Sequence, residues 1–108
     1  PTAPAPATVP PRELEERRIA GEHHILPDDV DKAAISQSGL TRLVGTFKLC
    51  VAPTGQVADV HVMKSTGVPG YDAKIVREMR TTWRYAPVVV DGVATAACTA
   101  VTFLYTQK

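Results

Sequence analysis

Two neighbouring stretches of alternating apolar and polar residues constrain the fold of this chain more than any other feature. Every second side chain is apolar between Phe47 and Val51, and the same period returns between Val60 and Val62. A period of two places successive side chains on opposite faces of a β-strand. The segment Pro53-Thr54-Gly55 between the two stretches is typical of a turn. Residues 43–63 are therefore predicted to form a β-hairpin with one face in the core.

Two further stretches favour helices that cover this hairpin. Residues 28–37 begin with acidic residues and are followed by Gly39, which is typical of a helix end. A second helix is predicted from Ala73 onward, with Asp72 as its N-cap. Its apolar side chains recur at helical spacing on one face: Ile75, Val76, Met79 and Trp83. We expect that face to pack on the hairpin.

The end of the chain supplies a third long strand. Residues 88–90 and 93–95 flank Asp91-Gly92, a dipeptide typical of a type I′ hairpin turn, and residues 101–105 alternate again. A right-handed crossover through the second helix places this last strand beside the first. The expected core face carries Phe47, Leu49, Val51, Val60, Val62, Val101 and Phe103. The predicted fold class is α+β, a small two-layer sandwich with a three-stranded antiparallel sheet of order 2-1-3, helices on one face and solvent on the other.

The two cysteines fit this arrangement. Cys50 ends the first strand and Cys98 precedes the last, so antiparallel pairing brings them together on the face opposite the core. Direct pairing of the two would also set Phe47 opposite Val101 and Gly45 opposite Phe103, which is a sensible register.

We therefore predict a disulfide between Cys50 and Cys98. It would contribute on the order of 3 to 5 kcal/mol and would persist in an oxidising compartment such as the periplasm. Two alternatives stay open: a pair of free thiols, and a metal site that includes His61, although the spacing matches no zinc pattern.

The N-terminal stretch differs from the rest in composition. The first eleven residues hold five of the nine prolines and no charge, which favours an extended spacer, with a solvated terminus of no role as the alternative. Residues 12–18 are charged and suit a short exposed helix. We assign residues 1–22 to a proline-rich linker with a short charged segment, and 23–108 to the folded domain. Because the chain begins with Pro and shows no signal sequence, we expect a fragment of a longer protein whose anchor lies upstream.

Composition argues against several classes of protein. The 12 Lys and Arg and 11 Asp and Glu are interspersed and give a net charge of +1, so no nucleic-acid partner is expected. The longest apolar runs fall far short of the roughly 20 residues of a membrane span, so this segment is expected to be soluble.

Sequence motifs for catalysis are also lacking. Without a glycine-rich phosphate loop, an HExxH or a GxSxG motif, we expect no enzyme activity, no cofactor and no metal. His23 and His24 are expected to be solvated loop residues. Ser65 and Thr66 are expected to make turn or cap hydrogen bonds.

An aromatic cluster closes the second helix: Trp83, Arg84, Tyr85 and Pro87. It could form a binding patch, but Trp83 continues the buried stripe of the helix, so core packing is favoured. Whether Arg84 stacks on an aromatic ring or pairs with a carboxylate stays open.

From Val44 to Tyr105 the chain resembles the C-terminal domain of TonB-type energy-transducing proteins. VGTFKLCV resembles the first strand of that family, and APTGQVADVHVMKSTG resembles its P-x-G-x-V-x-x-V hairpin with the following Ser-containing turn. YDAKIVREMRTTWRYAP resembles the family helix that ends in W-R-Y-x-P, and CTAVTFLY its final strand. The family often opens with Tyr-Pro, where this chain has Leu26-Pro27, and the cysteine pair is not part of the general pattern.

The resemblance implies a periplasmic domain on a protein anchored in the inner membrane. In this family a short peptide of an outer-membrane receptor adds beside the last strand, and force from inner-membrane motor proteins is passed on for transport. The residues implied at this edge are Val101, Thr102, Phe103, Leu104 and Tyr105. The 2-1-3 sheet supports this, because its last strand has an open edge.

Two alternatives remain at this point. The same fold could serve as a structural connector in an envelope-spanning machine of the motility or secretion type, without receptor peptides. The free edges could also pair between two copies to make a homodimer.

Overall fold

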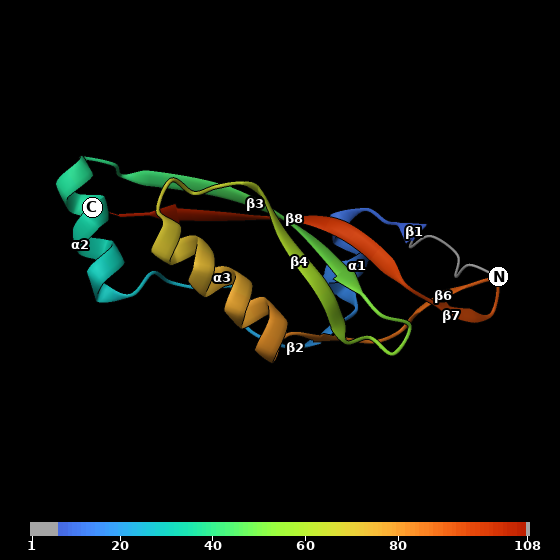
Figure 1. Cartoon of the computed structure of the whole chain (residues 1–108). Helices are drawn as coiled ribbons and strands as arrows, with labels where there is room; N and C mark the ends of the chain where they lie inside the picture. The colour runs from blue at the N-terminus through green and yellow to red at the C-terminus, as the bar shows by residue number, and fades with distance from the viewer. Residues whose placement is uncertain (1–6, 108) are drawn as a thin grey trace.

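The alternating segments form the long strands of a mixed sheet in the computed structural model, which describes residues 7–107. The central strand β3 (Arg42–Val51) pairs antiparallel with β4 (Val57–Lys64) on one side and with β8 (Ala97–Thr106) on the other. These neighbours are the predicted ones. Figure 1 shows that β3 and β8 run along the long dimension of the molecule, whose extents are 51 × 25 × 20 Å.

The predicted number of strands is wrong, because a fourth strand joins the sheet. β1 (Ala7–Thr8) lies parallel to the beginning of β8 and gives the order β1-β8-β3-β4. Ala7 and Val9 sit between the prolines and keep the backbone N–H groups that proline lacks. They donate to the carbonyls of Ala96 and Cys98, each at 3.0 Å. Composition suggested a spacer, but these two donors are enough to attach the stretch to the sheet.

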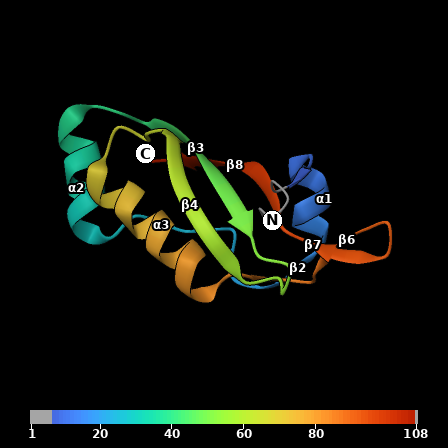
Figure 2. The same cartoon turned by 45° about the vertical axis from the view of Figure 1, so that its right-hand side comes forward.

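Three helices accompany the sheet. α3 (Pro69–Thr82) lies along one face, and α2 (Asp29–Ser38) lies at the end where β8 finishes (Figures 1 and 2). The Lys74 ammonium on α3 donates to the Asp28 carboxylate at 2.8 Å, and this hydrogen bond lowers the pKa of the Asp28 carboxyl. The third helix, α1 (Pro11–Glu16), corresponds to the charged segment and contacts β8.

The start of α3 differs from the prediction. Asp72 is not the N-cap, because the helix already begins at Pro69, whose fixed φ suits the first helical position. The Asp72 carboxylate instead accepts hydrogen bonds from Ser65 Oγ, and from the Thr66 backbone N–H at 3.0 Å and Oγ1 at 2.6 Å. Ser65 and Thr66 thus make the turn hydrogen bonds that were predicted for them.

Short strands complete the fold. β2 (Arg18–Ala20) pairs with β5 (Arg84–Tyr85), and β6 (Val88–Val90) pairs with β7 (Val93–Thr95). The predicted hairpin turn at Asp91-Gly92 is confirmed, since both residues have positive φ, 51° and 78°, as a type I′ turn requires.

The core lies between the sheet, α3 and the N-terminal segment. Its largest fully buried side chains are Trp83, Tyr71, Phe47, Leu14, Ile35, Leu49, Ile75, Met79, Val51 and Val88. Val62 was expected here, but it is 45% exposed. It does face α3, yet β4 is the outer strand of the sheet, so the space between Val62 and Val76 opens to solvent.

Part of the expected linker belongs to the folded body. Leu14 on α1 is 1% exposed and joins the core, and Val9 packs against it. β2 adds backbone pairing to β5. The folded body therefore extends upstream of residue 23 to include residues 7–20, while the first six residues lie outside the described part of the chain.

We expect Trp83→Ala to lower the free energy of unfolding by about 3 to 5 kcal/mol, because truncating a fully buried indole leaves a cavity. The backbone of Gly21 approaches this ring so closely that a Cβ there would lie 2.4 Å from it, so the indole is tightly enclosed. Urea denaturation followed by circular dichroism measures the change.

Val30→Ala is the matched control. Val30 is 81% exposed, and its truncation should stay within about 0.5 kcal/mol of wild type. A Trp83→Ala midpoint equal to that of the control would contradict the core assignment.

Candidate functional site

The five residues predicted for partner binding lie in the second half of β8. Val101 and Phe103 are buried in the core, and Tyr105 is half-buried against it. Thr102 and Leu104 point to the other face and are exposed, Leu104 by 56%. The five side chains therefore lie on two opposite faces of the strand, so what they have in common is the backbone between them.

The backbone hydrogen bonds of β8 alternate between its two sides. The Cys98 carbonyl accepts from Val9 and so points away from β3. Because successive residues of a strand direct their N–H and C=O groups to opposite sides, those of Ala100, Thr102 and Leu104 point the same way. Within residues 7–107 no backbone group of another segment bonds to these three. The N–H and C=O groups of Val101, Phe103 and Tyr105 instead point towards β3. We call the outward side of residues 100–104 the β8 edge.

The N-terminal segment borders the β8 edge. β1 covers Ala97 and Cys98 only, so the edge begins just beyond it. Residues of α1, of the loop after β2 and of α3 line two hollows beside the edge: Pro11, Arg12, Glu15 and His23 near Ala100, and His23, His24, Ile25, Leu26 and Tyr71 near Leu104. The edge is thus a groove with walls rather than a flat rim.

His23 is the residue here that the sequence did not identify. It was expected in a solvated loop, but its ring stacks on Phe103 with centroids 4.9 Å apart and lies 5.9 Å from Trp83. No local signal marks this position, because both aromatic partners are more than fifty residues away in the sequence. His24 is exposed, as expected.

The predicted disulfide is present. Cys50 and Cys98 pair directly across β3 and β8 with Cα atoms 4.0 Å apart, and Phe47 opposes Val101 as expected. This distance fits a non-hydrogen-bonded pair, in which side chains lie closest. It excludes free thiols and withdraws both sulfurs from metal binding. Within the described part of the chain, no group of three or more metal-ligating side chains comes together.

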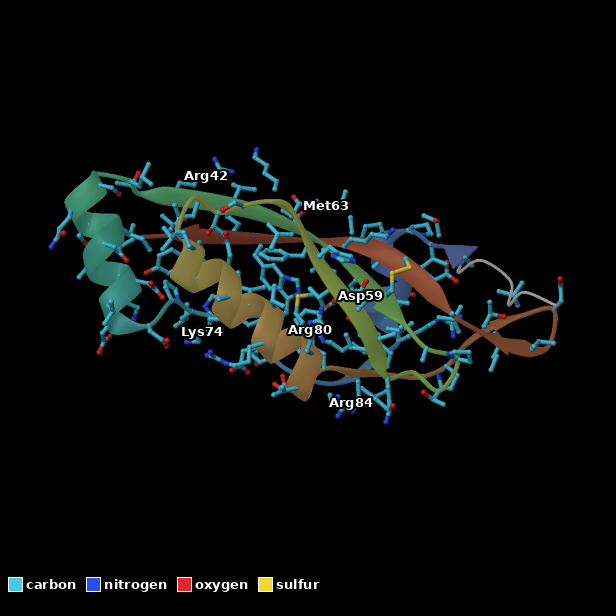
Figure 3. The ribbon with its side chains drawn as sticks, in the orientation of Figure 1. Arg42, Asp59, Met63, Lys74, Arg80 and Arg84 are labelled. Carbon is cyan, nitrogen blue, oxygen red and sulfur yellow. A yellow bond between two sulfur atoms is a disulfide. The ribbon has the colours of Figure 1, made fainter. Side chains whose placement is uncertain are left out.

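The aromatic cluster after α3 is structural. Trp83 and Tyr85 are buried, and the guanidinium that stacks on Trp83 is that of Arg18, 4.7 Å from the ring centroid. Arg84 points to solvent (Figure 3) and donates to the Trp83 carbonyl at 2.7 Å. Pro87 is exposed, and its carbonyl accepts a hydrogen bond from Arg17.

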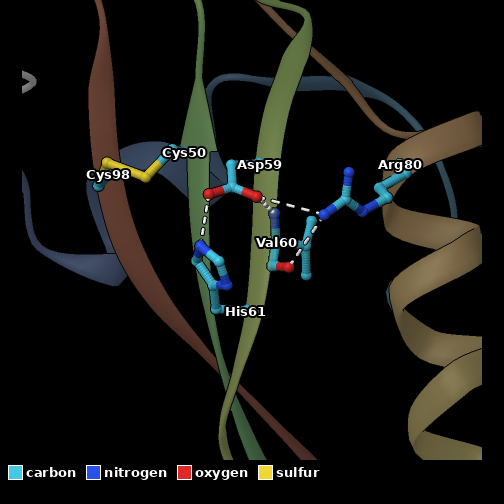
Figure 4. Close-up of polar contacts among 6 residues, drawn as sticks. All are labelled: Cys50, Asp59, Val60, His61, Arg80 and Cys98. Atoms are coloured by element: carbon cyan, nitrogen blue, oxygen red, sulfur yellow. Dashed lines mark hydrogen bonds and ion pairs between the residues drawn. A yellow bond between two sulfur atoms is a disulfide. The ribbon is translucent and has the colours of Figure 1, made fainter.

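A cluster of charged and polar side chains lies on the opposite edge of the sheet, at β4. Asp59 on β4 contacts Arg80 on α3 at 3.2 Å and His61 Nε2 at 2.6 Å (Figures 3 and 4). Sequence analysis considered His61 only as a metal ligand beside the cysteines. The spacing of Asp59 from Arg80, 21 residues apart, gives no local signal for the pair.

Two buried tyrosines resist ionisation. Burial raises the pKa of Tyr71 to about 12, and burial also raises the pKa of Tyr85. The Tyr71 hydroxyl donates to the Ile25 carbonyl at 2.7 Å and so holds the loop beside the β8 edge. Both phenols are therefore neutral structural groups at physiological pH.

No known family model and no curated protein matches this chain. In residues 7–107, no helix combines the length and the apolar character that crossing a membrane requires.

We expect reduction of the disulfide to lower the free energy of unfolding by about 3 to 5 kcal/mol, since the bond closes a long loop in the unfolded chain. Urea denaturation with and without dithiothreitol measures the loss. The double variant Cys50→Ser, Cys98→Ser should resemble the reduced protein and be insensitive to dithiothreitol. Equal midpoints for oxidised and reduced protein would contradict the expectation.

The raised pKa of Tyr71 predicts a loss of stability in alkali. The unfolded phenol ionises near pH 10, below the folded value of about 12, so the contribution is complete below pH 10 and is lost as the pH rises towards 12. In urea unfolding experiments, Tyr71→Phe should reduce the dependence of the free energy of unfolding on pH above 10. Tyr85, whose pKa is also raised, should cause part of the dependence that is left. Parallel pH profiles for wild type and variant would refute the assignment.

Proposed function

We propose that this domain is a TonB-like periplasmic module that binds an extended peptide of an outer-membrane receptor by strand addition at the β8 edge. It would then transmit force from an inner-membrane motor for transport across the outer membrane. The observation that carries the proposal is the set of outward backbone groups at Ala100, Thr102 and Leu104. They stand in the strand that, in the resembling family, accepts such a peptide.

The chemistry of the partner follows from the edge. A bound strand would bond to the three outward residues and would span on the order of five residues. Its alternate side chains would enter the hollows beside His23 on one face and lie next to Leu104 on the other. Most of the affinity would come from backbone hydrogen bonds, so the peptide would need no fixed sequence motif. An apolar residue at the position beside the exposed Leu104 would add to it.

The connections of β8 suit a load-bearing role. β8 pairs with β3 from Arg42↔Thr106 to Val51↔Ala97, and the disulfide adds a covalent link between the two strands. β1, which continues from the N-terminal linker, pairs with the same β8. Tension between the linker and a bound peptide would therefore pass through β8, which the β3 ladder and the disulfide hold in the sheet.

One observation favours a second candidate function. β1 already occupies the beginning of the β8 edge, which leaves less backbone for a foreign strand. This suits a structural connector in an envelope-spanning machine of the motility or secretion type, where the fold is held in place without receptor peptides. Protein partners captured from the envelope would distinguish the two functions.

An NMR titration of the oxidised domain tests the proposal. Peptides from the N-termini of candidate outer-membrane receptors should shift the amide signals of Ala100, Thr102 and Leu104. The amides of β4 serve as an internal control and should not move. Silence with every receptor peptide would reject the receptor-binding function and favour the connector.

Thr102→Pro should abolish peptide binding, because proline removes an outward N–H from an edge strand without removing a bond to β3. Thr102→Val keeps the N–H and is the matched control, with affinity within a few-fold of wild type. A thermal melt verifies that both variants fold. Unchanged binding by Thr102→Pro would exclude strand addition at this position.

A further inference from the structure

The other side of the sheet ends in β4, where side chains occupy the outward backbone groups of one residue, Val60. Since Cys50 and Cys98 form a non-hydrogen-bonded pair, Cys50 directs its N–H and C=O groups towards β4. Its partner Asp59 directs its own groups back towards β3. By alternation, Val60 and Val62 point theirs outward, away from the sheet.

Both outward groups of Val60 have partners from within the chain (Figure 4). The Val60 N–H donates to Asp59 Oδ1 at 3.0 Å, and Arg80 Nη2 donates to the Val60 carbonyl at 3.3 Å. Arg80 Nη2 also donates to Asp59 Oδ1 at 3.2 Å, which closes the group into a ring of contacts. His61 Nε2 holds the other carboxylate oxygen at 2.6 Å and so fixes the orientation of Asp59.

A neighbouring position lacks this arrangement. Among residues 7–107, no side chain bonds to the backbone of Val62, and the Val62 side chain is 45% exposed. Met63 on the opposite face is 62% exposed. An outer strand with exposed apolar side chains on both faces is a surface on which another strand can pair, and its nearest candidate partner is the same strand of a second copy.

We propose that Asp59 and Arg80 form a clasp that closes the β4 edge to strand addition. The clasp occupies both outward groups of Val60 with charged side chains, so an incoming strand would have to break the ion pair and two hydrogen bonds. Without the clasp, β4 strands of two copies could pair antiparallel, and Val62 and Met63 of one copy would then contact the same residues of the other. Strand addition is thereby restricted to the β8 edge.

Hydrogen exchange and sedimentation velocity test the clasp on the free domain, without any peptide. The protection factor of the Val60 amide should exceed that of Val62 on the order of tenfold, and Asp59→Ala should abolish the difference. Asp59→Ala and Arg80→Ala should each turn a monomer into a species that associates with rising concentration. Both residues are partly exposed, so the variants are expected to fold.

Arg77→Ala is the matched control, because Arg77 lies one turn before Arg80, lines the same hollow beside Val62 and, within residues 7–107, makes no hydrogen bond or ion pair with β4. It should remain monomeric. Association of the Asp59→Ala variant should survive a second change, Thr102→Pro, which would block only the β8 edge. Monomeric clasp variants, equal protection of Val60 and Val62 in wild type, or association lost with Thr102→Pro would overturn the proposal. None of these results depends on whether a receptor peptide binds at β8.

Discussion

The antiparallel pairing of β3 with β8 is the constraint on which the rest of the structure depends. Because side chains alternate along a strand, a slip of β3 by one residue would turn Phe47 out of the core and bring Lys48 in. The same register decides which way the backbone groups of β8 and β4 point. The disulfide holds it covalently, since Cys50 and Cys98 meet only when Phe47 opposes Val101.

This register gives the sheet two different edges. At β8 the outward groups of Ala100, Thr102 and Leu104 have no backbone partner in the described part of the chain. At β4 the outward groups of Val60 are bound by Asp59 and Arg80. An unpaired edge invites pairing with any strand, so a domain built for one partner strand benefits from closing the other edge. The two outer sides of the sheet therefore differ in how many of their backbone groups already have partners.

The N-terminal segment shapes the β8 edge as much as the sheet does. β1 sets where the edge begins, α1 and the loop at residues 23–26 form its wall, and Tyr71 holds that loop by its hydroxyl. His23 and Arg18 both pack on Trp83, so this buried side chain connects the loop beside the β8 edge with the core. A displacement of the N-terminal segment would therefore act directly on the β8 edge.

The sequence by itself determined the elements whose signals are local. The hairpin, the last strand and the Asp91-Gly92 turn follow from alternation and turn chemistry over short distances. The cysteine register, between residues 48 apart, followed from the predicted pairing of the first and last strands. Only the tertiary structure decided the contacts between distant segments: the attachment of β1, the burial of Leu14, the exposure of Val62 and the pairing of Asp59 with Arg80. Composition predicts a spacer from Pro and Ala, yet the N–H groups of Ala7 and Val9 donate to the carbonyls of Ala96 and Cys98 at the start of β8. Such acceptors exist only after the sheet has formed, so no local pattern could indicate them.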